Sequence, residues 1–276
     1  MPKLVEKYAK NVRENEPIEY CGLLFYPLMV EDYSLYSAAK PSFELMQASL
    51  PPAFARLSWF GCLDELDKLA TEKGEHSHFL ELTLLVIARS LRLESAIDKT
   101  SSEEVLPIRV ARFNSDGKVS AVIVGELQNP VVLSTNHLNE VREIISAQNC
   151  YEIPDENWNP ELVKAKQYTD SQESSGIVFD LDTLVASVAH AAHVRPKEIW
   201  KWTIKEFIDE QDAIDRALNY QIYTQASCSG FVKFKNGNPY PTWKFNKEVD
   251  IPDTFTTVTE LDKGANGLLG TSGAKF

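Results

Sequence analysis

Alternating apolar and polar positions predict short strands in the first half of the chain. Residues 18–26 (IEYCGLLFY) are β-branched and aromatic and are followed by Pro27, so they predict one strand. A stronger signal comes from two apolar runs, 106–113 and 119–127, which are joined by a turn containing Asp-Gly. The run PVVLS at 130–134 predicts a third strand. Together these segments predict a short antiparallel sheet.

Apolar residues at helical spacing predict helices around these strands. Residues 28–40 have this spacing, and Pro41 should end that helix. Pro51-Pro52 should open a helix over 53–70, because proline is tolerated in a first turn. The cap for that helix would be Ser49.

A further apolar segment, 79–95, predicts a buried helix. It contains Glu81, Arg89 and Arg92, and is too short and too charged to cross a bilayer of roughly 30 Å. We therefore expect no membrane association.

Residues 134–149 predict a capped helix, with Thr135 or Asn136 ahead of Glu140. Four apolar residues fall on one face of this helix and should be buried: Leu138, Val141, Ile144 and Ile145.

The second half of the chain has a helical pattern. Asp180 should cap a helix up to residue 194. The segment 195–230 then fits one long amphipathic helix, or two with a break near Asp209, and Gly230 should end it.

Composition shifts divide the chain into segments. Residues 151–176 are polar, contain two prolines and end in a Ser/Gly cluster, so they predict a linker. We therefore expect an α+β protein with a mixed domain at 1–150 and a helical domain at 177–248 that ends in a hairpin-like segment. The Thr- and Gly-rich residues 249–276 predict a flexible tail.

The segment 229–245 (SGFVKFKNGNPYPTWKF) interleaves aromatic residues with lysines. Such a composition can form a stacking platform for single-stranded nucleic acid. A hairpin is favoured over that platform, because Asn236-Gly237 supplies a turn. Pro239 and Pro241 would keep the return arm out of regular pairing, and Trp243 and Phe245 would pack back on the helices.

Charge and cysteine usage narrow the classes of partner. The formal net charge is −12 and the isoelectric point is about 5.0, which argues against a nucleic-acid phosphate backbone as the main partner. An acidic surface suits a basic or aggregation-prone polypeptide. Four scattered cysteines without a C-x-x-C motif predict reduced, mostly buried thiols in the cytoplasm.

The sequence contains no recognisable catalytic constellation. It lacks the G-x-S-x-G nucleophile motif and the glycine-rich nucleotide loops, so we expect a non-enzymatic protein without a cofactor. His190 and His193 have i, i+3 spacing on a predicted helix and are weak metal candidates, because no third ligand lies near them in the sequence.

Residues 180–208 have the pattern of two helices joined by a short turn, which is also typical of a DNA-binding helix-turn-helix. The second helix would present Lys197, Lys201 and Lys205. Acidic residues share that segment, and its tryptophans have the pattern of a core, so DNA binding is the weaker interpretation.

Two stretches resemble a known group of proteins: IEYCGLLFYPLMVEDYSLY at 18–36, and ALNYQIYTQASCSGFVKFKNGNPYPTWKF at 217–245. They are similar to proteins encoded just ahead of the tape-measure protein in tailed phages and prophages of Gram-positive bacteria, a group regarded as tail assembly chaperones or minor tail proteins. The resemblance covers about fifty residues at the two ends. The residues that carry it are structural landmarks: Tyr26, Pro27, Gly230, Asn236, Gly237, Pro239, Pro241 and Trp243.

What the resemblance implies is a role in phage tail assembly inside the bacterial host cell. The expected partner is a helical protein client such as a tape-measure protein, bound through apolar grooves, and no catalytic residue carries over. Two alternatives remain open: a permanent component of a tail or tail-like particle, and a DNA-binding regulator acting through residues 180–208. The oligomeric state is not predicted.

Overall fold

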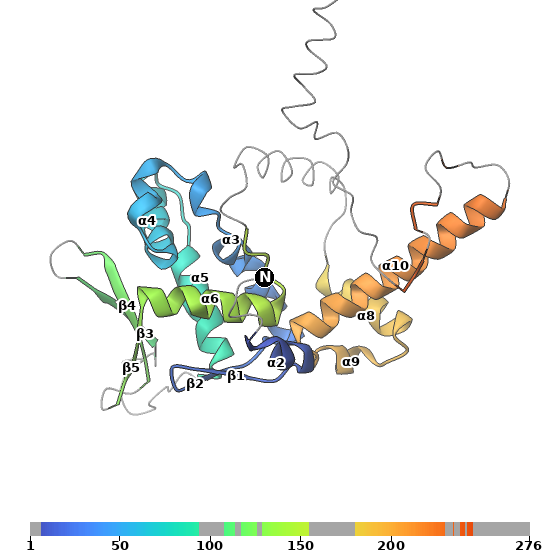
Figure 1. Cartoon of the computed structure of the whole chain (residues 1–276), viewed down its shortest axis with the longest axis horizontal. Helices are drawn as coiled ribbons and strands as arrows, with labels where there is room; N and C mark the ends of the chain where they lie inside the picture. Colours follow the sequence, from blue (N-terminus) through green and yellow to red (C-terminus); the bar gives the residue numbers. More distant parts are fainter. Residues whose placement is uncertain are drawn as a thin grey trace, which may run out of the picture. The chain divides into compact units, whose positions relative to one another are not determined.

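A computed structural model describes residues 7–93, 108–113, 117–125, 129–154 and 180–229, together with 234, 238–240 and 242–244. These residues form helices and two antiparallel sheets, one of two strands and one of three, which confirms the α+β class (Figure 1). The contacts between residues divide the chain into two compact units, Met1–Gln211 and Asp212–Phe276.

The division falls inside a helix after Gln211, whereas we expected a linker at 151–176. Residues 155–176 of that linker lie outside the described residues, as does the expected tail. The described chain from residue 180 to Gln211 nevertheless belongs to the first unit. Leu28 accepts a backbone hydrogen bond from Ile204 (2.9 Å), and Val30 donates one to Trp202 (2.9 Å).

The expected strand at 18–26 is instead a tight hairpin. Strand β1 (Ile18–Tyr20) pairs with β2 (Leu23–Phe25) in antiparallel register. Between them Cys21 and Gly22 have φ of 53° and 75°, the left-handed pair that a two-residue type I′ turn requires. The prediction missed this turn, because Gly22 is the only residue in it that is typical of turns and the apolar run continues across it.

Pro41 does not end the first predicted helix, as we expected it to do. After the short α2 (Ala9–Glu14) and a 3₁₀ turn at Val30–Asp32, helix α3 spans Tyr33–Phe43 and continues through Pro41. Tertiary packing outweighs the lost backbone bond there, since Phe43 is fully buried and Trp59 Nε1 donates to the Ser42 carbonyl at 2.8 Å.

Pro51-Pro52 opens a 3₁₀ helix, not the expected α-helix. The 3₁₀ helices Gln47–Ser49 and Pro52–Arg56 lead into α4 (Trp59–Glu72). Its cap is Ser58, whose Oγ accepts from the Gly61 amide at 3.2 Å, so Ser49 does not cap it.

Helix α5 (Phe79–Ser90) is capped from outside its own segment. His78 precedes it but makes no side-chain cap bond. The Asp67 carboxylate on α4 accepts from the amides of Phe79 (3.0 Å) and Leu80 (2.9 Å) instead. This bond pattern satisfies two of the amides that a helix N-terminus leaves free.

The predicted three-stranded sheet is confirmed. Strands β3 (Ile108–Arg112), β4 (Val119–Val124) and β5 (Val131–Ser134) pair in the order β3-β4-β5, both pairs antiparallel. A register irregularity between Ala111 and Arg112 allows Arg112 to reach Asp64 on α4 with two hydrogen bonds, at 2.7 and 2.6 Å.

Helix α6 (Thr135–Asn149) contributes several buried side chains to the core of the first unit. Its predicted buried face is confirmed, since Leu138, Val141, Ile144 and Ile145 are all buried. The cap differs from the prediction: Ser134 and His137 form the capping box, so Thr135 and Asn136 already lie in the helix.

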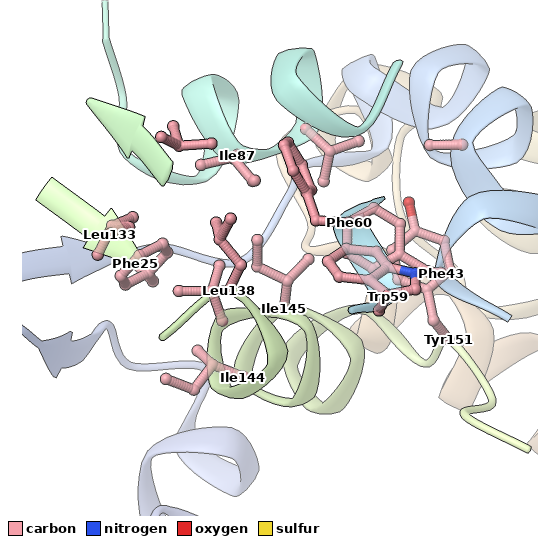
Figure 2. Close-up of a cluster of buried hydrophobic side chains, with 14 of the residues drawn as sticks. Phe25, Phe43, Trp59, Phe60, Ile87, Leu133, Leu138, Ile144, Ile145 and Tyr151 are labelled. Atoms are coloured by element: carbon pink, nitrogen blue, oxygen red, sulfur yellow. The ribbon is translucent and has the colours of Figure 1, made fainter. Parts of the chain in front are cut away.

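One end of that core is aromatic. Tyr151 stacks on Tyr36 and on Phe43, with ring centroids 4.7 and 4.6 Å apart, and Phe43 contacts Trp59. Figure 2 shows Phe43, Trp59 and Tyr151 together, beside the residues that α6 contributes. These rings join α3, α4 and the segment after α6, and thereby fix the interior of the unit.

Later helices partly follow the prediction. Helix α8 (Leu181–Ala191) begins at Asp180, whose carboxylate accepts from the Thr183 amide, as predicted. Helices α9 (Pro196–Ile199) and α10 (Ile204–Cys228) are separated at 200–203, not near Asp209. No helix in the described ranges is long and apolar enough to cross a membrane.

The cysteines differ from the expectation of mostly buried thiols. None of the four forms a disulfide, but only Cys62 is fully buried; Cys150 is half-buried, and Cys21 and Cys228 are exposed.

Candidate functional surfaces

The two histidines do not lie on one helix face. Helix α8 ends at Ala191, and His193 has a φ of 59°, so it stands beyond the helix end. Both side chains are exposed. Within the described residues no group of three or more His, Cys, Asp or Glu side chains is placed to hold a metal ion.

Tyr26 and Pro27 lie in an extended segment that joins three parts of the first unit. The Tyr26 amide donates to the Ser90 carbonyl at 2.7 Å, and the Arg92 guanidinium lies 3.8 Å from the Tyr26 ring centroid. The Leu28 amide donates to Asn149 Oδ1 at 2.7 Å. These contacts are structural.

The second landmark segment is described only in part. Gly230, Asn236, Gly237, Pro241 and Phe245 lie outside the described residues, and Pro239 is half-buried. Trp243 does not pack back on the helices as expected, because it is 53% exposed.

Two other aromatics of that segment provide the packing. The ring centroids of Tyr240 and Phe234 lie 5.1 and 5.5 Å from that of Tyr223 on α10. The Tyr240 amide also donates to Asn238 Oδ1 at 2.9 Å, which makes a local turn.

The lysines of the DNA-binding alternative are not presented on one helix. Lys197 is exposed on the four-residue α9, Lys201 follows it, and Lys205 on α10 pairs with Asp209. The start of α10 is buried through Ile204 and Phe207, and Thr203 forms a β-bridge with Met29. A recognition helix needs an accessible N-terminal end, so this arrangement gives DNA binding no support.

A titratable cluster joins the β1–β2 hairpin to α6. Burial raises the pKa of Tyr20, and a hydrogen bond with Glu140 raises it further. The Tyr20 and His137 rings meet edge to face at 6.2 Å. Since Tyr20 stays protonated and donates, the cluster attaches the hairpin to the helix and offers no activated nucleophile.

The outer face of the three-stranded sheet is partly exposed in the described parts of the chain, and it is apolar except for Arg109 and Ser134. Figure 1 shows α4, α5 and α6 on one side of this sheet, and that side contains the buried residues Ile108, Val122, Val124 and Leu133. Strand alternation turns their neighbours outward. Ile123 pairs with Val132 in the middle of this outer face.

Two residues of the outer face are strongly exposed: Val132 by 53% and Phe113, which follows β3, by 56%. Ala111 and Ala121 form the adjacent pair across β3 and β4. Arg109 lies opposite Ile123 on this face, and Ala121 is buried. We call Phe113, Ala111, Arg109, Ala121, Ile123 and Val132 the outer sheet face. Large exposed apolar side chains on a sheet face mark a candidate contact surface.

The sequence contained a signal for this face that the prediction did not use. Strand β4 (VSAVIV) and the run VVLS are apolar at nearly every position. A sheet with one solvated face alternates apolar and polar residues, so continuous apolar runs indicate two covered faces.

A second apolar surface lies on α10. Leu218 is 51% exposed and Ile222 is 59% exposed, one turn apart, and Ile214 is one turn before them. We call Ile214, Leu218 and Ile222 the α10 stripe.

Comparisons of this chain with protein-family models, with curated proteins and with solved structures found no match. The two surfaces and the resemblance of the terminal segments are therefore the observations from which a function is argued.

Proposed function

We propose that this protein is a non-enzymatic phage or prophage tail assembly factor, chaperone-like, that binds a helical protein client such as a tape-measure protein. The observation that carries the proposal is the outer sheet face, where Val132 and Phe113 expose apolar surface on a sheet whose other face is covered. The resemblance of residues 18–36 and 217–245 to proteins of this group supports it.

An amphipathic helix is the client that fits this face. A sheet with helices on one side reaches a common layered architecture when a helix also covers the other side. Ala111 and Ala121 have short side chains beside the larger Ile123 and Val132, so a helix can approach the sheet closely at the alanines. A net charge of −12 adds attraction for a client with basic residues.

The proposal places a tape-measure gene beside this one, and the test is co-expression with that tape-measure protein, followed by co-purification. Wild-type protein should form a complex and raise the solubility of the client. Val132→Lys places a charge in the proposed contact, so the yield of complex should fall about tenfold or more. Leu24→Lys is the matched control, because Leu24 is a similarly exposed strand residue on the other sheet.

The outcomes separate the alternatives. If wild-type protein neither binds the client nor improves its solubility, the proposal is wrong. Mass spectrometry of purified particles distinguishes an assembly factor, which should be missing from them, from a permanent tail component. A gel shift on duplex DNA at low salt tests the regulator alternative, which predicts steeply salt-dependent binding.

A further inference from the structure

The α10 stripe continues the helix face that is buried at the start of α10. Ile204 and Phe207 are the buried residues of this helix. Steps of three and four residues along the same face lead through Gln211 to Ile214 and Leu218, with Ile222 one turn further. This is the heptad-like spacing that helices use when they pair.

The opposite side of the helix is already occupied. Tyr223 contacts Phe234 and Tyr240, and it lies about 140° around the helix from Leu218 at 100° per residue. Those contacts therefore leave Leu218 and Ile222 exposed.

We propose that the α10 stripe binds the α10 stripe of a second copy of this chain, antiparallel, with the two-fold axis at Leu218. The stripe is self-complementary in this register. Leu218 meets Leu218 of the second copy, Ile214 meets its Ile222, and Gln211 meets its Gln225. An interface of this kind is isologous, as a closed dimer requires. The paired segment, 211–225, is about 22 Å long.

The charges on α10 select the antiparallel direction. Its acidic residues, five in number, all lie between Glu206 and Asp215, and residues 217–228 carry no charge. In an antiparallel pair each acidic half lies along the uncharged half of the other helix. In a parallel pair Asp215, which flanks the stripe, would lie beside the acidic half of the second helix and be repelled by it.

The interface is small, so we expect a dimer that dissociates on dilution. Sedimentation velocity over a concentration series should show a monomer–dimer equilibrium. Leu218→Glu should lower the association constant about tenfold or more, because it places two carboxylates at the axis. Ala217→Glu is the control, since Ala217 is exposed on the same turn but lies off the stripe. Val132→Lys on the sheet should leave the dimer unchanged.

Cysteine cross-linking tests the direction of pairing. In a background with Cys21→Ser, Cys150→Ser and Cys228→Ser, Leu218→Cys should cross-link to itself. Ile214→Cys and Ile222→Cys should each fail to do so alone, and should cross-link when the two variants are mixed. Circular dichroism should show unchanged helix content in every variant.

Three results would overturn the proposal. One is a protein that stays monomeric at all concentrations up to about 100 µM. If the Leu218→Glu variant of such a monomer also loses client binding, the stripe binds the client instead. Another is self-cross-linking of Ile214→Cys, which would mean parallel pairing. The last is a dimer that Leu218→Glu does not weaken, because its interface would then lie elsewhere.

Discussion

Asp64 connects helix α4 to the β3–β4 hairpin. Its carboxylate is nearly buried and accepts two hydrogen bonds from Arg112, and it forms an ion pair with Lys68 at 2.8 Å. Burial raises the pKa of Asp64, but the hydrogen bonds from Arg112 and Lys68 outweigh it and hold the pKa below its usual value of 3.8.

Asp64→Asn should therefore destabilise the first unit. The free energy of unfolding should fall by about 2 kcal/mol at neutral pH. This value lies between those for an exposed and for a fully buried ion pair, because Arg112 and Lys68 are themselves partly exposed. Urea unfolding followed by circular dichroism measures it. Glu65→Gln is the control on the same helix, since Glu65 makes only an exposed contact with Lys68.

The same substitution has a defined pH dependence. A carboxyl group whose pKa is lowered by folding contributes its full stability above its unfolded pKa, and loses it as the pH falls through the folded pKa. The difference in stability between wild type and Asp64→Asn should thus be constant from about pH 7 to 5 and shrink below about pH 4. A difference that does not change with pH would contradict the ionic role of Asp64.

At the scale of elements, α5 depends on α4 for its first turn. Asp67 accepts from the amides of Phe79 and Leu80 and from the Ser77 hydroxyl at 2.7 Å. The two helices are thereby joined at one residue.

Asp67→Ala should cost about 1–2 kcal/mol, because two helix-terminal amides and a hydroxyl lose their acceptor. Hydrogen exchange should show faster exchange at the amides of Phe79 and Leu80. Glu72→Ala, exposed at the end of the same helix, should change neither. Equal exchange in the two variants would mean that Asp67 does not cap α5.

The same scale shows how much of the fold the sequence predicted. The β3–β4 hairpin, the buried face of α6 and the cap of α8 were all predicted, because each depends on residues close together in the chain. The caps of α4 and α6 were placed on the wrong residue, since neighbouring polar residues are equivalent until the helix start is known. The cap of α5 could not be predicted, because Asp67 is twelve residues from the amide it binds.

At the scale of the whole molecule, the first turn of α10 belongs to the first unit. Phe207 is fully buried, and its ring meets that of Tyr33 edge to face at 6.0 Å. An independent helical domain at 177–248 would not require this contact.

Phe207→Ala should destabilise the first unit by about 3–5 kcal/mol, because it leaves a cavity beside Tyr33. The loss should appear as reduced hydrogen-exchange protection in α6, which is distant in sequence. Asp212→Ala, exposed on the same helix, should stay within about 0.5 kcal/mol of wild type. Unchanged protection of α6 would support two independent domains divided near 151–176.

The sequence by itself determined the α+β class, the three-stranded sheet and the amphipathic character of α6 and α10, because these follow from periodicity within short windows. Tertiary structure decided which apolar faces are covered. The bonds that close the first unit join residues far apart in the chain, such as Leu28 with Asn149 and Tyr36 with Tyr151. Periodicity marks a face as apolar but does not identify its partner. The outer sheet face and the α10 stripe therefore became visible as surfaces only after the rest of the core was placed.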